Sequence, residues 1–205
     1  AGEIYLENKN YNKAISVLKT LEEGADFQQN IIFAQSNIMK ASYELKNYPQ
    51  TITYAEKVLN TSKVDDRIKS DAYTMIARSA IATGDEAKAK KAYAEVQKIA
   101  TGELAAEALY YDAYFKNKEK NYEASNASAQ RLAKDYSAYK ETGGKGLIIM
   151  AKNFFAMDDA FQATYILQSV IDNFSQYPAI VEEAKTQLSI MKAKESERNS
   201  SVNPN

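Results

Sequence analysis

The sequence predicts an all-α fold: a right-handed α-solenoid of about five helix-turn-helix repeats, followed by a C-terminal capping helix. Three observations support this prediction. A short turn recurs along the chain, apolar residues follow each turn at helical spacing, and the 205 residues include only 3 prolines and 7 glycines. A repeat of this kind can bury its apolar face only against its neighbours, so we expect the repeats to stack.

The recurring turn is marked by an Asn or Asp that ends one apolar-periodic segment and starts the next. The five residues are Asn10, Asn47, Asp85, Asn121 and Asp159, which lie 37, 38, 36 and 38 residues apart. Asn and Asp are strong N-cap residues, because their side-chain oxygen accepts a hydrogen bond from a free amide of the first helical turn. Gly84, just before one of these caps, is suited to the positive φ that ends a helix.

Apolar residues at steps of three and four place one stripe along each predicted helix, as Ala89, Tyr93 and Val96 do. The predicted helices span residues 1–8, 11–23, 28–45, 48–61, 66–82, 85–100, 103–118, 121–136, 144–157 and 159–174. They pair into repeats at about residues 1–26, 27–64, 65–101, 102–140 and 141–176.

A last helix is expected over residues 178–195, with one apolar face and the rest polar, as a solenoid cap requires. We therefore expect one superhelical domain over residues 1–196 and a disordered tail over residues 197–205. Ile4 and Tyr5 already carry apolar periodicity, so we also expect the chain to be part of a longer protein.

The segment Thr142 to Gly146, TGGKG, has some likeness to a phosphate-binding loop. It lacks the earlier glycine and the Ser or Thr after the lysine, and no strand precedes it. We therefore expect a flexible loop between repeats.

The composition argues against several classes of function. The chain has no Cys and no His, so thiolate chemistry and the commonest general base and metal ligand are missing. The 26 basic and 27 acidic residues nearly cancel, without the basic excess typical of nucleic-acid binders. No apolar run approaches the roughly 20 residues of a spanning helix. We expect a non-catalytic protein with no cofactor or metal, no nucleic-acid partner and no direct membrane insertion.

The hairpins resemble tetratricopeptide repeats, in which a small residue in the second helix is followed four residues later by a large one. The third repeat has Ala89 and Tyr93 in these positions, and the fifth has Ala163 and Leu167. The small residue lets two helices approach closely while the large one fills the space beside it. The resemblance covers nearly the whole chain.

Two repeats depart from the pattern. The second has Thr51 and Ala55 where the motif has a small and a large residue. The fourth has Asp112 and Lys116 at normally apolar positions, and Ser125 in place of the alanine. The third and fifth repeats thus match the motif best.

The long period, the Asn- and Lys-rich composition and the segment FQATYILQSVIDNF resemble repeats of bacterial cell-envelope proteins. Large repeat proteins of the Bacteroidetes and outer-membrane-assembly lipoproteins are the groups most similar in this respect. That resemblance implies a periplasmic or outer-membrane-associated location.

In tetratricopeptide domains the first helices of the repeats line a concave groove that holds a peptide or a partner's helix. The resemblance places the following residues in this groove: Phe33, Lys40, Tyr43, Arg78, Tyr110, Tyr114, Asn117, Lys152 and Phe155. Further candidates are Ser36, Asp71, Thr74, Glu107, Lys145 and Ile148. Lys40, Arg78 and Lys152 share one helical position, and cations flanked by aromatic rings could bind carboxylates and apolar side chains of an extended chain. The alternative is that these are ordinary surface side chains.

The sequence therefore predicts a protein- or peptide-binding scaffold or adaptor. The alternative function is a structural spacer or self-association module of a bacterial outer-membrane assembly. Carbohydrate binding through some of the 15 tyrosines is a further option. The identity of the partner and the oligomeric state are not encoded in any motif of the chain.

Overall fold

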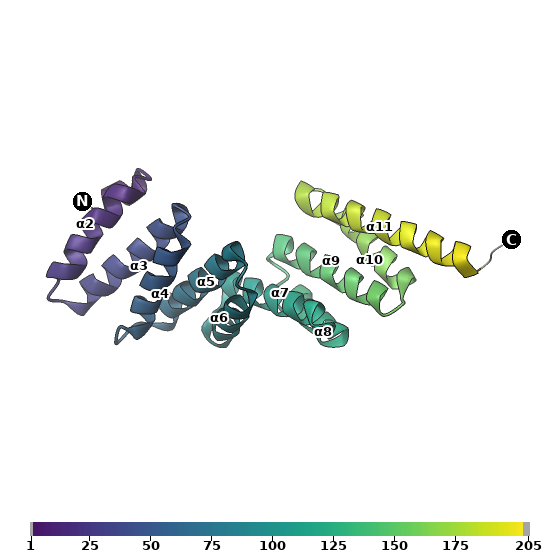
Figure 1. Cartoon of the computed structure of the whole chain (residues 1–205), viewed down its shortest axis with the longest axis horizontal. Coiled ribbons are helices and arrows are strands. Elements are labelled where there is room, and N and C mark those ends of the chain that lie inside the picture. Colours follow the sequence, from purple (N-terminus) through teal and green to yellow (C-terminus); the bar gives the residue numbers. More distant parts are fainter. Residues whose placement is uncertain (1, 203–205) are drawn as a thin grey trace. The chain divides into compact units, whose positions relative to one another are not determined.

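The computed structural model describes residues 2–202, which form eleven α-helices and no strands. The helices are α1 (Gly2–Glu7), α2 (Tyr11–Gly24), α3 (Gln28–Glu44), α4 (Tyr48–Asn60), α5 (Asp66–Thr83), α6 (Glu86–Ile99), α7 (Gly102–Lys118), α8 (Tyr122–Asp135), α9 (Lys140–Ala156), α10 (Ala160–Asn173) and α11 (Pro178–Val202). This confirms the predicted all-α fold of stacked helical hairpins (Figure 1). Most helix ends lie within two residues of the predicted ones.

The chain divides into two compact units, Ala1–Leu104 and Ala105–Asn205. We call them unit 1 and unit 2. The division falls near the start of α7, close to the expected end of the third repeat. Within unit 1, each helix from α1 to α6 packs on the next, and α3 also contacts α5, the first helix of the following repeat. Within unit 2, α9 packs on α8, α10 and α11.

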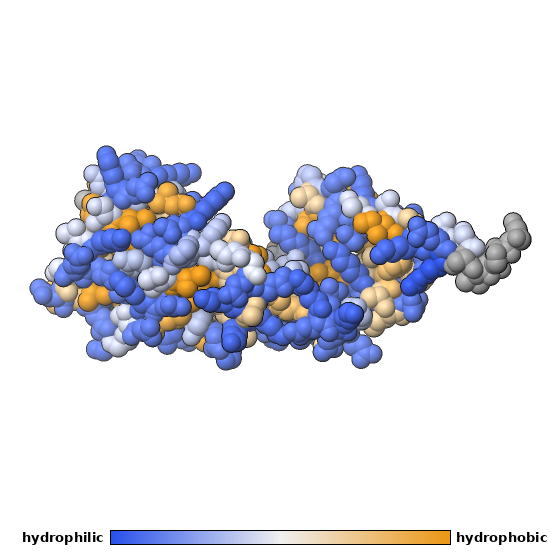
Figure 2. All heavy atoms as spheres, in the orientation of Figure 1, coloured by the Kyte–Doolittle hydropathy of each residue, from blue (hydrophilic) through white to orange (hydrophobic). Residues whose placement is uncertain are grey.

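The apolar stripes expected from the sequence form the cores. In unit 1 the buried side chains include Leu18, Ile38 and Val58, each no more than 1% exposed. In unit 2, Leu167 and Val170 of α10 pack with α9 and α11. Hydrophilic residues cover most of the face seen in Figure 2, and apolar residues show there only in small separate patches.

The recurring turn is a combined helix ending and helix start. In all five turns the Asn or Asp donates its backbone N–H to the carbonyl five residues earlier, at 2.7–2.9 Å, as in a Schellman motif. The residue before it has positive φ, and these residues are Lys9, Lys46, Gly84, Lys120 and Asp158. Four of the five caps then accept the N–H three residues ahead, whereas Asn121 makes no such side-chain bond.

The expectation of a loop at Thr142 to Gly146 is wrong, because α9 begins at Lys140 and includes the whole segment. Two of its glycines are explained by close packing. A Cβ on Gly144 would lie 2.9 Å from a ring carbon of Phe174, and one on Gly146 would lie 2.9 Å from Leu132. Glycine lowers helix propensity, but only glycine leaves room for neighbouring helices at this distance.

The expected end of the last helix also differs from the structure. Helix α11 continues through residues 197–202, which the sequence assigned to a disordered tail. Arg198 forms ion pairs with Asp158 at 3.0 Å and Glu195 at 3.4 Å, contacts that help to hold these last turns. Residues 203–205 lie outside the described part of the chain.

The polar residues of the fourth repeat form a hydrogen-bonded network instead of leaving a gap in the motif. The Asn153 side chain of α9 is 0% exposed and donates to Ser125 Oγ at 2.8 Å and to Asn126 Oδ1 at 2.7 Å. It also accepts a bond from Asn117 Nδ2 at 2.7 Å, while Ser125 donates to the Ala113 carbonyl at 2.6 Å. Buried polar groups are tolerated when their hydrogen bonds are satisfied, as these are.

A second polar group lies beside this network. Lys116 Nζ lies 2.6 Å from the Asp112 carboxylate and 3.0 Å from Ser128 Oγ, and Ser128 also donates to Asp112. The two charges that depart from the apolar pattern therefore compensate each other within α7, and Ser128 of α8 bonds to both. The ion pair explains how Asp112 and Lys116 are accommodated at positions that are normally apolar.

Candidate protein-binding faces

An ion pair joins α3 to α5 in unit 1, and another joins α9 to the capping helix α11 in unit 2. In unit 1, Lys40 Nζ of α3 lies 2.8 Å from the Asp71 carboxylate of α5. In unit 2, Lys152 Nζ of α9 lies 3.3 Å from the Glu183 carboxylate of α11. Both pairs join residues 31 positions apart. The two lysines expected to bind a ligand carboxylate therefore already have a carboxylate partner, Lys40 in the next repeat and Lys152 on the capping helix.

Phe33 is the most accessible aromatic ring among the predicted groove residues of unit 1, with 36% of its surface exposed. It lines a cleft of about 390 Å³ between α3 and α5, together with Ser36, Lys40 and Asp71. It also lines a second cleft, of about 450 Å³, whose other residues belong to α1, α2 and α3. Four predicted groove residues of unit 1 thus come together around one cleft.

The remaining candidates of unit 1 differ in their surroundings. Tyr43 packs edge to face on Tyr48 at the hairpin turn, with ring centroids 5.9 Å apart. Arg78 is half-buried on α5. Thr74 is 1% exposed, so it belongs to the core and not to a groove.

The candidates of unit 2 lie mostly within packed surfaces. Tyr110 and Tyr114 pack against the cluster of Ala113, Ala129 and Ile149. Burial raises the pKa of the Tyr110 hydroxyl far above its ordinary value, with smaller effects from neighbouring acidic groups. Tyr110 therefore stays neutral and packs as an aromatic side chain.

Three further candidates of unit 2 are engaged by the protein itself. Asn117 donates to Asn153 in the buried network. Phe155 lies beneath Arg198 of α11, whose guanidinium carbon is 5.7 Å from the ring centroid. Ile148 is 1% exposed and belongs to the core. The contacts of Asn117 and Phe155 depend on residues of other helices, which the pattern within one helix does not show.

Sequence reasoning missed a polar cluster on the α2, α3 and α4 side of unit 1. Lys57 of α4 lies 2.9 Å from the Glu22 carboxylate and 4.4 Å from the centre of the Tyr54 ring. Burial raises the pKa of Glu22, but hydrogen bonds from Lys57 and Gln35 and the charge of Lys57 outweigh it and hold the pKa below its usual value. The Glu22 hydrogen bond raises the pKa of Lys57. This cluster joins the first and second repeats.

Within the described residues, no three Asp or Glu side chains gather in a way that could hold a metal ion. No helix in that part of the chain has the length and hydropathy needed to cross a bilayer. The arrangement offers clefts, aromatic rings and paired charges, which are means of binding.

One segment of the chain, in the third repeat, matches a known family. Residues 71–100 match the tetratricopeptide repeat family. This segment spans most of α5 and all of α6, one of the two repeats expected to carry the tetratricopeptide motif best. Tetratricopeptide repeats generally mediate protein–protein interactions and are generally non-catalytic.

The fold also has a close counterpart among solved structures. It is similar to the C-terminal part of a TPR repeat-containing protein from Cytophaga hutchinsonii, with a TM-score of 0.62 and 13% identity over 94% of this chain and 78% of the other. At this identity the likeness shows the fold alone. No curated protein matches the chain in sequence. The neighbour comes from the Bacteroidetes, as the resemblance implied, and the cell-envelope location stays a prediction.

Proposed function

We propose that the chain is a non-catalytic protein-binding module and that the first-helix face of unit 1 binds an extended peptide segment. The observation that carries this proposal is the position of Phe33, an exposed ring between two clefts of about 390 and 450 Å³. An aromatic side chain with space on both sides can receive apolar side chains of a bound chain.

The charges around the α3–α5 cleft support an acidic or mixed peptide. Lys40 and Asp71 neutralise each other, and the Asp65 carboxylate accepts the N–H of Ile68 as a helix cap at 2.8 Å. Lys63 and Arg67 are exposed and also line the cleft. They would attract a carboxylate next to the apolar residue that contacts Phe33.

The proposal is tested by selecting peptides from a random displayed library on the whole chain and measuring their affinity for variants. We expect Phe33→Ser to weaken the selected peptides at least tenfold, because the apolar anchor is lost while the exposed position leaves the fold intact. Phe161→Ser is the matched control, since Phe161 is 80% exposed on α10 of unit 2. Circular dichroism checks that both variants keep their helices. If peptides selected on the chain bind Phe33→Ser as tightly as the unmodified protein, the proposed site is wrong.

A second candidate function is self-association in a bacterial envelope assembly, favoured by one surface feature. Phe161 and Tyr165 lie one turn apart on α10 and are 80% and 66% exposed. Exposed aromatic pairs of this kind are typical of contact surfaces. Light scattering on a size-exclusion column distinguishes the two functions, because a dimer that dissociates in Phe161→Ser would favour self-association, whereas a monomer would favour the peptide-binding module.

A further inference from the structure

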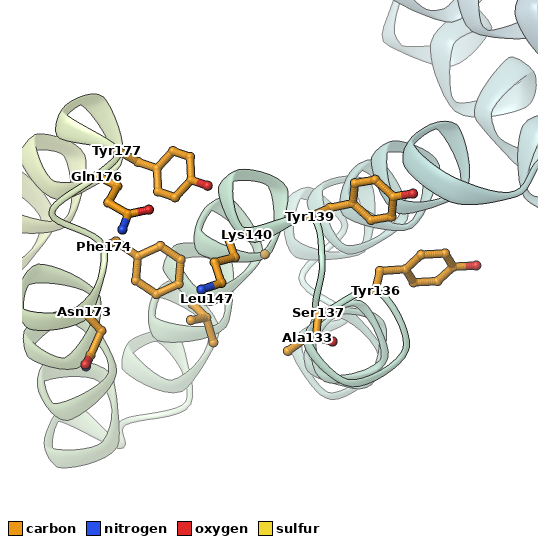
Figure 3. A pocket seen from close by; sticks show the side chains of 11 residues that line it. Ala133, Tyr136, Ser137, Tyr139, Lys140, Leu147, Asn173, Phe174, Gln176 and Tyr177 are labelled. Carbon is orange, nitrogen blue, oxygen red and sulfur yellow. The ribbon is translucent and has the colours of Figure 1, made fainter.

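Unit 2 contains a slot at the loop end of the fifth repeat, and none of the predicted groove residues lines it. Its volume is about 430 Å³, within the range of about 300–1,000 Å³ of small-ligand pockets. One wall consists of Asn173, Phe174, Gln176 and Tyr177 at the end of α10 and in the loop to α11, as Figure 3 shows. The opposite wall comes from the end of α8 and the loop to α9, and α9 supplies Lys140, Gly143 and Leu147.

The aromatic side chains have different roles in the two walls. The rings of Tyr136 and Tyr139 point away from the Phe174 wall in Figure 3 and pack on Leu109 and Leu132. Phe174 and Tyr177 lie with ring centroids 6.4 Å apart on the other wall. The residues equivalent to Phe174 and Tyr177 in the first three repeats are Ala25 and Gln28, Ser62 and Asp65, and Ala100 and Glu103. In the fourth repeat they are Tyr136 and Tyr139 of the opposite wall, so both loops that border the slot carry an aromatic pair that the first three repeats lack.

Gly143 is the residue of this slot that packing does not explain. A Cβ on Gly144 or Gly146 would meet neighbouring side chains at 2.9 Å, whereas a Cβ on Gly143 would meet nothing within 4 Å. Its φ is not in the positive range that favours glycine. A glycine inside a helix lowers stability by about 1 kcal/mol relative to alanine. The missing side chain leaves the slot open, and no other benefit is apparent in the packing.

The lining defines the chemistry of the ligand. Phe174, Tyr177 and Leu147 present an apolar surface, while Lys140 is the only charged residue in the lining. Within the described part of the chain Lys140 forms no ion pair, and the neighbouring Glu141 lies 3.5 Å from Lys145 Nζ. An apolar pocket with one uncompensated cation fits an apolar group attached to a carboxylate.

We propose that this slot binds the C-terminal residue of a peptide, with its apolar side chain against Phe174 and its α-carboxylate at Lys140. In an extended chain, successive side chains point to opposite sides, so the carboxylate of a neighbouring Asp or Glu would face away from the slot. The α-carboxylate shares its Cα with the buried side chain and can reach Lys140. Asn173 donates its amide N–H to the Ser169 carbonyl at 2.8 Å, and its Oδ1 remains to accept a peptide N–H.

The experiment uses the whole chain and fluorescein-labelled pentapeptides, Ser-Gly-Ser-Gly followed by Phe, Leu, Ile or Met, measured by fluorescence polarisation at low salt. Each peptide is made with a free carboxylate and as the C-terminal amide. We expect at least one free acid to bind, with its amide weaker by about two- to fivefold, the effect of losing one exposed charge pair. Lys140→Gln should weaken the free acid to the same extent, whereas Lys134→Gln, on the exposed end of α8, should not change its affinity.

Gly143→Leu is the decisive variant, because it fills the slot and favours the helix. We expect it to abolish binding while the melting temperature stays the same or rises. Phe33→Ser should leave binding unchanged, so that this site is distinguished from the groove of unit 1.

Any of four results would overturn the proposal: no free acid binds up to about 1 mM, the amide binds equally well, Gly143→Leu still binds, or Phe33→Ser abolishes binding. Maltose or chitobiose binding that Gly143→Leu removes, without any peptide binding, would assign the slot to a saccharide and also overturn it.

Discussion

Replacement of Asn153 by alanine tests whether the buried polar network holds the fourth and fifth repeats together. The Asn153 side chain is 0% exposed and uses both amide protons and its oxygen in three hydrogen bonds to α7 and α8. Alanine removes all three hydrogen bonds at once. Water cannot replace these bonds unless the helices separate.

The expected loss follows from these bonds. Each intramolecular hydrogen bond contributes about 1 kcal/mol net, so three contribute about 3 kcal/mol. Asn126 is 7% exposed and loses its partner, which adds the cost of an unsatisfied buried group, about 1 kcal/mol or more. We expect Asn153→Ala to lower the free energy of unfolding of unit 2 by about 3–4 kcal/mol.

The measurement is urea denaturation followed by circular dichroism, together with native-state hydrogen exchange to locate the effect. The largest loss of protection should fall on amides of α8 and α9. Asn117→Ala is the control, because it removes only one of the three bonds. It also leaves the buried Asn153 Oδ1 without this partner, so it should cost about 2 kcal/mol, less than Asn153→Ala.

A loss below about 1 kcal/mol for Asn153→Ala would refute the reasoning, since it would mean that the three bonds contribute no more than one typical bond. An equal loss in Asn153→Ala and Asn117→Ala would refute it too.

Three further predictions concern stability. Lys120 has φ 61°, a value that favours glycine, so Lys120→Gly should raise the free energy of unfolding by about 0.5–1 kcal/mol. Gly84 has φ 79°, so Gly84→Ala should lower it by a similar amount. The midpoints of urea denaturation check both. Gly144→Ala should lower stability by about 1–3 kcal/mol because the new Cβ meets Phe174 at 2.9 Å, and a neutral result in thermal unfolding would contradict this packing argument. The pKa of Glu22 is lowered in the folded state. The ionised Glu22 therefore stabilises the fold above about pH 4.5, and this stabilisation is lost as the pH falls through the folded-state pKa. Glu22→Gln should flatten this part of the curve of unfolding free energy against pH.

Local patterns were enough to predict the helices and the turns between them. Asn and Asp caps act within three residues, and apolar stripes repeat within one helix, so both are visible in a short window of sequence. The glycines of Thr142 to Gly146 indicated a loop, but the segment is helical. Gly144 and Gly146 are instead required because neighbouring side chains occupy the space of a Cβ. That space is occupied by Leu132 of α8 and by Phe174, which follows the end of α10.

The candidate site was predictable only as a helix face. The sequence placed Phe33, Ser36, Lys40 and Asp71 on first helices, and they do meet around one cleft. It could not show that Lys40 and Lys152 are paired, because their partners lie 31 residues away, in the next repeat and on the capping helix. The slot beside Gly143 was missed for the same reason, since its two walls come from different repeats.

The sequence by itself thus determined the class of the fold, the number of repeats and the position of the turns, since hydrogen bonds and apolar periodicity within one hairpin specify them. The tertiary structure decided which polar residues are partners and which glycines are required. It also decided where clefts remain open. These properties depend on contacts between side chains of successive repeats, and each one is set by the distance and orientation of two helices rather than by the residues of either helix alone.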